Sequence, residues 1–292
     1  MILRKRKMNQ NQPDFFNEWI VRKRNRITRK NKNWLCVTCG ETGTSKSYSS
    51  SRICELIDPS FIPCIIENGI TSRLAMGFAS NFITMITKGK EERTLGRGSM
   101  CMFDEAGVGL SSRDWYTESN KVVNYVLQTF RHFNIGVIFT VPDLSFIDVQ
   151  ARKLFHTYLE CLKIDYEKNQ AIIKPMDMQN NPRMGEIYFK YPIFHGVKIT
   201  RFWISKPSEE FIKRYEPLKV DLSDQLAKDA IESNEYERRK REFKKLTDGD
   251  IMKAIKQQHI PLDAYTLRFR FGIGKDRAYA IISNYEKFSP SI

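Results

Sequence analysis

Residues 40–47 read GETGTSKS and match the phosphate-loop pattern G-x-x-x-x-G-K-[ST] at every fixed position except one. In this pattern backbone N–H groups surround phosphate oxygens, and the start of the next helix adds its positive end. We expect Lys46 to reach the β- and γ-phosphates of ATP and Ser47 to bind Mg²⁺ through its hydroxyl. A Ser/Gly-rich turn without nucleotide is the alternative. The predicted nucleotide-binding residues are Gly40, Glu41, Thr42, Gly43, Thr44, Ser45, Lys46, Ser47 and Tyr48.

The one departure from the pattern is Ser45, which stands where the second glycine is normally found. If the backbone at this position needs a positive φ, a side chain costs about 1 kcal/mol relative to glycine. Gly43 lies two residues earlier and supplies part of the conformational freedom that the loop requires. The departure therefore bears more on the rate of hydrolysis than on nucleotide binding.

A second chemical signal is the apolar run Met100–Phe103, which ends in Asp104 and Glu105. An acid at the end of a buried strand holds the magnesium ion in phosphate-loop enzymes, and we expect Asp104 to do so. Glu105 is then placed to polarise the attacking water for hydrolysis. Two carboxylates at a solvated strand end are the alternative, which the upstream phosphate loop disfavours.

Two residues further along the chain are candidates for catalysis. Thr140 ends an apolar run, and a polar residue at the tip of that strand can sense the γ-phosphate. Arg131 precedes the same run and can stabilise transition-state charge, in this subunit's site or in a neighbour's. A surface arginine that caps the preceding helix is the alternative for Arg131.

The elements that must position these residues alternate between strand and helix. This alternation indicates an α/β fold with a mainly parallel sheet. Past residue 155 the pattern changes to hairpins, one over 158–166 and 171–175 and another over 186–192 and 197–204 around His195-Gly196, which extend the sheet in an antiparallel direction. Predicted strands of the first part are 34–39, 62–67, 99–103 and 135–140, and predicted helices are 44–57, 71–87 and 119–132.

With these motifs in order, the chain resembles the FtsK/HerA superfamily of P-loop ATPases, which have a RecA-like core. The stretches DEAGVGLSSRDWYTESNK and RHFNIGVIFTVPDLSFID are similar to compact archaeal and viral DNA-packaging members and to the Zot-like proteins of filamentous phages. The resemblance covers roughly residues 33–220. It implies nucleotide roles for Lys46, Ser47, Asp104 and Glu105, a candidate arginine finger in Arg131, and a hexameric ring.

The chain has 292 residues with 48 Lys+Arg against 34 Asp+Glu, a net charge of +14. Residues 1–32 hold 11 Lys/Arg and two acids, so this arm carries +9 of the excess. Clustered basic residues favour contact with a polyanion, and a mobile arm that only aids solubility is the alternative. We expect Arg22, Lys23 and Arg24 to contact DNA.

The last 47 residues have the layout of a helix-turn-helix. A helix is expected over 247–258, and a pair of helices on either side of Phe271-Gly272-Ile273. Gly272 permits the turn, Ile273 fills the space between the helices and Ala278 allows their close approach. A three-helix cap for protein contact is the alternative. The side chains expected to meet DNA are Lys275, Arg277, Tyr279 and Asn284.

The sequence thus predicts a basic arm (1–32), an ATPase domain (33–206), a charged helical linker (207–245) and a helix-turn-helix domain (246–292). The function we expect is an ATP- and Mg²⁺-dependent DNA motor that works as a ring of identical subunits. A nucleotide-switched DNA-binding regulator or partition-type protein, and a Zot-like morphogenesis ATPase that acts on protein, are the alternatives.

No apolar run long enough for a membrane span occurs, and Cys36 and Cys39 are expected to fill the core rather than bind metal. We expect a cytoplasmic protein of an archaeal or bacterial cell, with viral or plasmid origin left open.

Overall fold

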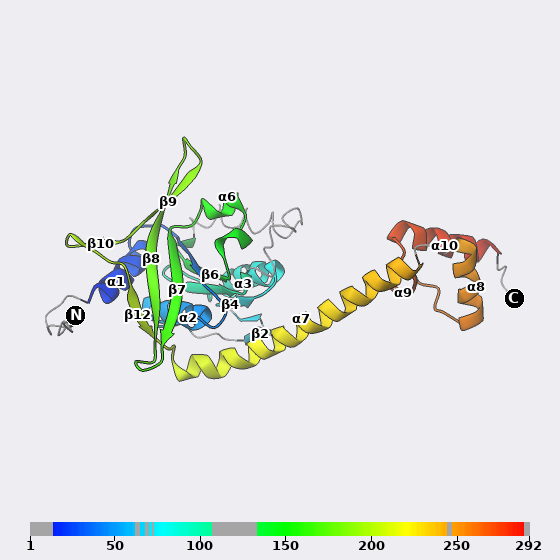
Figure 1. Ribbon diagram of the computed structural model, residues 1–292, viewed down its shortest axis with the longest axis horizontal. Helices are drawn as coiled ribbons and strands as arrows, with labels where there is room; N and C mark the ends of the chain where they lie inside the picture. Colours follow the sequence, from blue (N-terminus) through cyan, green and yellow to red (C-terminus); the bar gives the residue numbers. More distant parts are fainter. Residues whose placement is uncertain are drawn as a thin grey trace, which may run out of the picture. The chain divides into compact units, whose positions relative to one another are not determined.

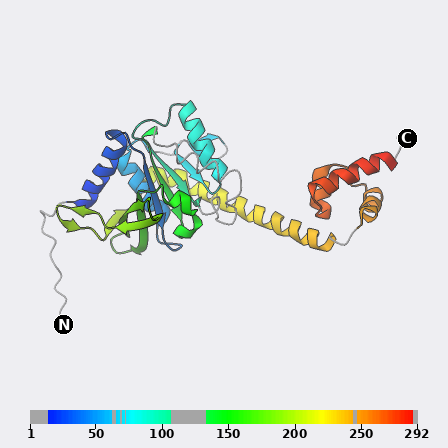
Figure 2. The same cartoon turned by 90° about the horizontal axis from the view of Figure 1, so that it is seen from above.

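The computed structural model describes residues 14–61, 65–67, 70–71, 73–106, 133–243 and 247–288 (Figures 1 and 2). The chain divides into two compact units, residues 1–219 and 220–292, and each is treated separately below. The predicted helix over 119–132, together with Arg131, lies outside the described residues. None of the described helices is both long and apolar enough to cross a membrane.

The first unit is built around an eight-stranded sheet with the order β12-β8-β7-β1-β6-β5-β4, and β9 pairs with β8. The five strands from β4 to β7 in this order run parallel, whereas β8, β9 and β12 are antiparallel to their neighbours. The predicted mainly parallel sheet with an antiparallel extension is confirmed. Its strands are β1 (Trp34–Cys39), β4 (Leu74–Met76), β5 (Met100–Asp104), β6 (Gly136–Val141), β7 (Thr157–Asp165), β8 (Gln170–Asn181), β9 (Glu186–Lys190) and β12 (Phe202–Ser205).

Helices cover both faces of the parallel part, which explains why β1, β5 and β6 are buried along their whole length. On one face, alternate β1 residues Leu35 and Val37 join a core with side chains of α3 (Ala79–Glu91) and the short α6 (Val149–Arg152). On the other face, α2 (Lys46–Ile57) packs against β1, β5 and β6. The phosphate-loop residues are therefore held between β1 and α2, in the strand–loop–helix context that the sequence predicted.

The basic N-terminal segment includes a helix, α1 (Phe15–Thr28), one side of which is buried. Trp19 meets Trp34 edge to face with ring centroids 5.7 Å apart, and Ile27 is fully buried. Asp14 caps the helix by accepting hydrogen bonds from the backbone N–H of Phe16 and Asn17. The alternative of a mobile arm does not hold for residues 14–28, because apolar side chains at helical spacing anchor them to the unit, and the expected DNA contact stays a prediction.

Two expectations for the region before β5 are also wrong. The segment 62–67 does not join the main sheet: its described part, β2 (Ile65–Glu67), forms a small hairpin with β3 (Ile70–Thr71). The edge strand β4 lies instead within the predicted helix 71–87, and α3 begins at Ala79. Pairing of β4 with β5 buries Leu74 and Ala75, and this tertiary burial overrides their helical spacing.

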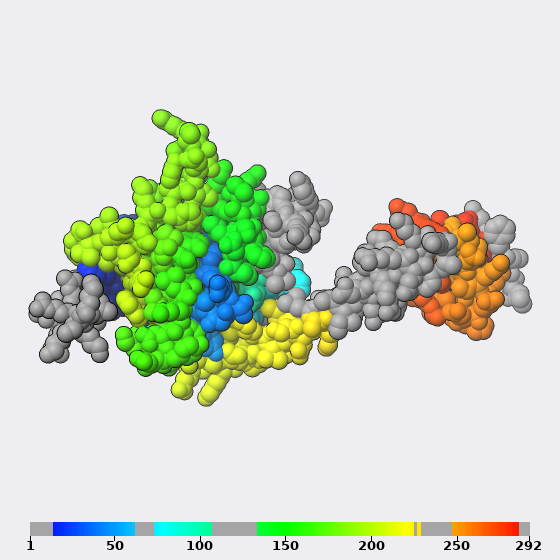
Figure 3. Space-filling model, in the orientation of Figure 1, coloured from blue at the N-terminus to red at the C-terminus, as the bar shows by residue number. Residues whose placement is uncertain are grey.

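In the antiparallel part the predicted hairpin of β7 and β8 is confirmed, but the second predicted pair is not formed. His195 and Gly196 do make a turn, with φ of 48° and 79°, between the short strands β10 (Ile193–Phe194) and β11 (Val197–Lys198). β9 and β12 pair with β8 rather than with each other. Figure 3 shows the β8–β9 hairpin standing out from the surface of the unit.

The long helix α7 (Glu209–Phe243) begins in the first unit, where Phe211, Tyr215 and Leu218 are buried, and continues into the second. The second unit contains α8 (Asp248–Gln258), α9 (Ala264–Phe271) and α10 (Lys275–Phe288). α8 begins with a capping box between Thr247 and Asp250. A small core holds these three helices together, formed by Ile251, Ile255, Ile260, Leu267, Phe271, Ile273, Ala278 and Ile281.

Within this unit, Gly272 ends α9 with a φ of 59°, as the sequence predicted for the turn. Ile273 and Ala278 are buried between the helices. The second unit is therefore a small all-α domain, and its use as a DNA-binding helix-turn-helix stays a prediction.

Candidate nucleotide site

The phosphate loop owes its shape to three residues with positive φ. Gly40 has a φ of 153°, and a Cβ there would lie 2.6 Å from the carbonyl oxygen of Cys161. Gly43 has a φ of 83°. Ser45, the residue that replaces the pattern's glycine, has a φ of 73° in the left-handed region. The loop therefore adopts the required backbone conformation with a serine at that position, at a cost of about 1 kcal/mol.

The loop side chains take up local contacts. Lys46 donates a hydrogen bond from Nζ to the carbonyl oxygen of Glu41, five residues earlier in the loop, at 2.9 Å. Thr44 donates its hydroxyl to the same carbonyl at 2.7 Å. Ser47 is the second residue of α2, and its carbonyl oxygen accepts a hydrogen bond from the Ser51 hydroxyl. The ammonium group is thus held above the loop, on the side where phosphates are bound in such loops.

The carboxyl ends of β5 and β6 bring the two acids and Thr140 together. Phe103 and Phe139 are register partners in these parallel strands, so Asp104 and Thr140 follow side by side. The Thr140 hydroxyl donates to Asp104 Oδ1 at 2.5 Å and accepts from the backbone N–H of Glu105 at 3.0 Å. One hydroxyl therefore fixes both acidic residues, and Thr140 is itself buried rather than part of the cavity wall.

The two acids differ in environment. Asp104 has no exposed surface, whereas the Glu105 side chain keeps 36% of its surface exposed. Glu105 has a φ of 53°, which turns the chain sharply after the strand. Its Oε1 lies 3.6 Å from Nζ of Lys219. Asp104 is thus a fixed buried group, and Glu105 a partly solvated one.

Sequence reasoning missed the contribution of α7 to this site, because residues 207–245 were expected to form a solvated linker. The Tyr215 hydroxyl donates to Asp104 Oδ2 at 2.5 Å. Glu216 accepts a hydrogen bond from the Tyr48 hydroxyl. Burial of the phenol, and then this hydrogen bond, raise the pKa of Tyr48 to about 12. The signal that was available is the apolar spacing of Phe211, Tyr215 and Leu218 within the charged sequence.

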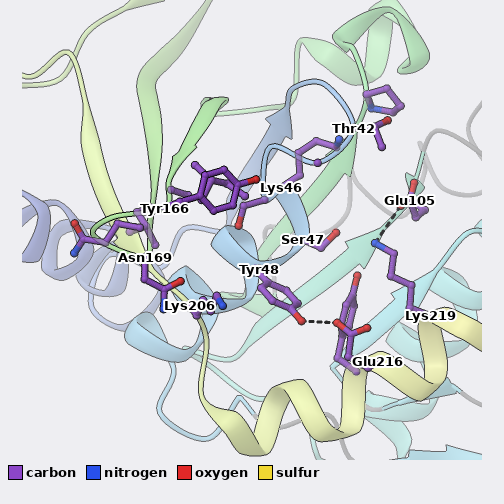
Figure 4. Close-up of a pocket in the computed structure, with 18 residues that line it drawn as sticks. Thr42, Lys46, Ser47, Tyr48, Glu105, Tyr166, Asn169, Lys206, Glu216 and Lys219 are labelled. Atoms are coloured by element: carbon purple, nitrogen blue, oxygen red, sulfur yellow. Dashed lines mark hydrogen bonds and ion pairs between the residues drawn. The ribbon is translucent and has the colours of Figure 1, made fainter.

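These elements enclose a cavity of about 490 Å³ (Figure 4). From the predicted nucleotide residues it is lined by Thr42, Gly43, Ser45, Lys46, Ser47 and Tyr48, and from the predicted catalytic ones by Glu105. Gly40, Glu41, Thr44, Asp104 and Thr140 are not among its lining residues. The remaining walls come from the β7–β8 turn, with Tyr166 and Asn169, and from Lys206 and α7. No arginine lines the cavity in the described part of the chain.

The donor set suits a magnesium ion bound together with a nucleotide. Hydroxyl and carboxylate oxygens are the ligands that Mg²⁺ prefers, and it is held by one or two protein groups plus phosphates. Ser47 and Asp104 are such groups, and Tyr215 interacts with both of them. No cluster of three His, Cys, Asp or Glu side chains occurs among the described residues.

Cys36, Cys39 and Cys161 are buried beside the loop without disulfides. Burial raises the pKa of Cys39 to about 12, so its thiol stays protonated. His156, which directly precedes β7, is partly buried, and its Nδ1 accepts from the backbone N–H of Leu35 at 3.0 Å. Burial, and then the charges of Arg26 and Lys23, lower its pKa to about 3.

The predicted DNA-contacting residues lie in two places. On α1, Arg24 is exposed, whereas Lys23 bonds Asp177 at 3.0 Å and Arg22 bonds Glu18 at 2.8 Å. On α10, Lys275, Tyr279 and Asn284 are exposed, and Arg277 bonds Asp248 on α8 at 2.7 Å. Arg22, Lys23 and Arg277 thus have partners within the chain.

Comparison with known protein families gives one match, which covers part of the chain. The family described as Zonular occludens toxin (Zot) matches residues 79–171, which run from α3 through β5 and β6 to the start of β8. This range includes Asp104, Glu105 and Thr140 but not the phosphate loop. Among the curated proteins, none matches the chain.

Solved structures give three examples of similarity. The N-terminal domain of zonular occludens toxin from Neisseria meningitidis is 17% identical, with 56% of this chain and 96% of that one covered and a TM-score of 0.34. The genome packaging NTPase B204 from Sulfolobus turreted icosahedral virus 2, in complex with ATP-gammaS, is 11% identical, with 57% and 100% covered and a TM-score of 0.33. B204, the DNA-packaging ATPase from Sulfolobus Turreted Icosahedral Virus, is 12% identical, with 56% and 98% covered and a TM-score of 0.34.

The left-handed loop after β1 and the acid at the end of β5 in the same parallel sheet fit the P-loop pattern. The chain therefore has the fold of a P-loop NTPase, and its residues 79–171 are similar to the Zot family.

Proposed function

We propose that this chain hydrolyses ATP to move DNA, in packaging or transfer, as a ring of identical subunits. The observation that carries the proposal is the junction at Thr140, whose hydroxyl ties Asp104 to the backbone of Glu105 beside the phosphate loop. A site that bound nucleotide without hydrolysing it would not need a partly exposed carboxylate in the wall of the cavity. Glu105 is such an acid, and it lines the cavity together with Lys46 and Ser47.

Each residue has one task in this proposal. Lys46 leaves the Glu41 carbonyl to meet the β- and γ-phosphates, and the backbone N–H groups of residues 42–47 bind their oxygens. Ser47 and Asp104 would hold Mg²⁺, and the ion would supply positive charge to neutralise the charge that develops on the phosphates. Glu105 accepts hydrogen bonds from the attacking water and orients it. Thr140 keeps the two acids in a fixed relation.

Two residues in the wall of the cavity support specificity for an adenine nucleotide. Tyr166 and Asn169 of the β7–β8 turn lie on the side away from Glu105 (Figure 4). An aromatic ring and an amide are groups that can stack on a base and hydrogen-bond to its edge. We assign this end of the cavity to the adenine base.

The ATPase is assigned to residues 33–206 together with the first turns of α7, and DNA contact to the second unit and Arg24. Exposed Lys275, Tyr279 and Asn284 on α10 offer a positive charge and polar groups to a DNA groove. Within the described residues the cations that line the cavity are Lys46, Lys206 and Lys219. An arginine finger from a neighbouring subunit, for which Arg131 is the candidate, would complete the charge.

The test is ATP turnover with and without double-stranded DNA over a series of salt concentrations. We expect DNA to stimulate turnover and the stimulation to fall steeply with salt, because phosphate contacts release counterions. Turnover that DNA does not change at any salt concentration would contradict the motor.

The similarity of residues 79–171 to the Zot family favours a second candidate, an ATPase that acts on protein during morphogenesis. This enzyme would use the same site, but its turnover would respond to a protein partner rather than to DNA. A nucleotide-switched DNA-binding regulator is distinguished from both by slow turnover together with sequence-specific DNA binding.

A further inference from the structure

Tyr215 reaches the nucleotide site from α7, outside the strands and loops that form the P-loop motifs. Its side chain is 1% exposed, and its ring stacks on Phe211 with centroids 5.3 Å apart. The ring of Tyr48, on the phosphate-loop helix α2, meets it edge to face at 6.1 Å. Because the ring is packed on two sides, the position of the Tyr215 hydroxyl is fixed by the fold.

That hydroxyl donates to Oδ2 of Asp104 at 2.5 Å, and Thr140 donates to Oδ1 at the same distance. Both oxygens of a carboxylate with no exposed surface therefore have a donor. Each carboxylate oxygen has two acceptor sites, so each keeps one for a water molecule bound to a metal ion. The contact from Tyr215 fixes the rotation of the carboxylate without occupying all its lone pairs.

The Tyr215 hydroxyl also interacts with the hydroxyl of Ser47, the second residue of α2. Its proximity to Ser47 also means that one hydroxyl meets both residues to which we assign the magnesium ion.

Two neighbouring residues of α7 show that this part of the helix is docked on the site. Glu216 accepts from Tyr48, and Lys219 lies 3.6 Å from Glu105 (Figure 4). Removal of the Tyr215 hydroxyl would leave a buried Oδ2 without this donor while the rest of the helix stays attached. Such an orphaned acceptor rotates to find another partner or pulls in water.

We propose that Tyr215 is a positioning residue that orients Asp104 for the Mg²⁺ bound with the nucleotide. The proposal rests on the proposed nucleotide site, and it adds a residue from α7 to it. When a group that hydrogen-bonds to a metal ligand is removed, the affinity for the metal typically falls 10–100-fold.

The test uses the full chain with Tyr215→Phe, which keeps the ring and removes the hydroxyl. Binding of a fluorescent ATP analogue (methylanthraniloyl-ATP) is measured in EDTA and across a Mg²⁺ titration, together with thermal unfolding. We expect unchanged binding in EDTA and a Mg²⁺ concentration for half-maximal effect that rises at least tenfold. Turnover should show the same shift and recover at high Mg²⁺.

Two control variants separate positioning from structure. Phe211→Leu weakens the ring packing around Tyr215 but keeps its hydroxyl, so it should lower the unfolding temperature and leave the Mg²⁺ midpoint near the wild-type value. Tyr188→Phe removes a hydroxyl that donates to Glu186 on β9, outside the cavity, and should change neither.

An unchanged or lower Mg²⁺ midpoint in Tyr215→Phe would overturn the proposal. So would a loss of binding in EDTA together with a fall in unfolding temperature like that of Phe211→Leu, because that pattern belongs to a structural role. If the wild-type chain binds the analogue without any effect of Mg²⁺, the proposal fails as well. If the wild-type chain does not bind the analogue at all, the proposed nucleotide site itself fails, which is a different outcome.

Discussion

The two units of this chain hold their candidate residues in opposite ways. In the first unit, the loop after β1, the ends of β5 and β6 and the first turns of α7 bring their side chains to one cavity, where Asp104 has two donors. In the second unit, the candidates Lys275, Tyr279 and Asn284 lie exposed along a single helix. Phosphoryl transfer requires groups that converge and exclude water, whereas contact with a long polyanion requires an accessible surface.

The difference also concerns how each unit stays folded. The first unit has a core on both faces of its sheet, whereas eight buried residues form the core of the second. A change in one unit should therefore leave the other folded and active in its own assay. The predictions below use this independence, from the largest effect to the smallest.

The largest effect is expected from Lys46→Ala. The variant removes the charge that we assign to the β- and γ-phosphates, and ATP turnover should fall by about 10²–10³-fold. DNA binding by the second unit should not change, and a mobility-shift assay at fixed salt checks this. Equal losses in both assays would mean that the two units are not independent.

The converse change is Leu267→Ala in the core of the second unit, where Leu267 is fully buried. A buried Leu→Ala substitution costs about 2–5 kcal/mol, which is enough to unfold so small a core. Circular dichroism melting should lose its contribution from this unit, and DNA binding should be lost. Binding of methylanthraniloyl-ATP to the first unit should stay at the wild-type level; its loss would contradict the comparison.

A pH effect is expected in the first unit from His156. Its pKa is about 3 when folded and 6.5 in the free side chain, so below pH 6.5 the unfolded chain binds the additional proton. The free energy of unfolding should therefore be constant above pH 6.5 and fall by about 1.4 kcal/mol per pH unit below it, until the pH approaches 3.

Urea unfolding at pH 7 and pH 5 measures this loss, which amounts to about 2 kcal/mol. The matched variant is His156→Asn, whose side-chain oxygen can still accept from the backbone N–H of Leu35. Its stability should lack this part of the pH dependence. The same slope in wild type and variant would assign the effect to other groups.

The smallest effect is expected at Ser45. Glycine relieves the left-handed strain but adds freedom to the unfolded chain, so Ser45→Gly should change the free energy of unfolding by at most about 1 kcal/mol. Nucleotide affinity should stay within a few-fold of wild type. Ser45→Val, with a branched side chain at φ 73°, should be clearly less stable, and equal stability of the two variants would contradict the observed backbone conformation.

The positions of the loop and of the strand-end acids in the fold were largely predictable from the sequence because both are local patterns, and their use as a nucleotide site stays a prediction. The fixed positions of GETGTSKS and the apolar run before Asp104 each fall on the element that the pattern requires. The sequence around Leu74 to Met76 led to a wrong prediction of helix. A strand of three residues is too short to show an alternating pattern, so the helical pattern of the residues that follow dominated the prediction.

Tyr215 illustrates what the sequence does not contain. Its partner Asp104 is 111 positions away in the sequence, and the 2.5 Å contact between them exists only because α7 folds back over the strand ends. The same holds for α1: its charges indicate a solvated arm, but Trp19 packs against Trp34 of β1 and Phe202 of β12, and Ile27 is fully buried. Long-range packing decided both cases.

The most direct test of the account is Glu105→Gln. Glutamine keeps the shape of Glu105 but removes the charge that orients the water, so the variant should bind methylanthraniloyl-ATP with Mg²⁺ like the wild type and lose turnover by at least 100-fold. Glu167→Gln, at an exposed acid in the β7–β8 turn, should turn over normally. Wild-type turnover in Glu105→Gln would contradict the assignment of this site as the hydrolytic centre.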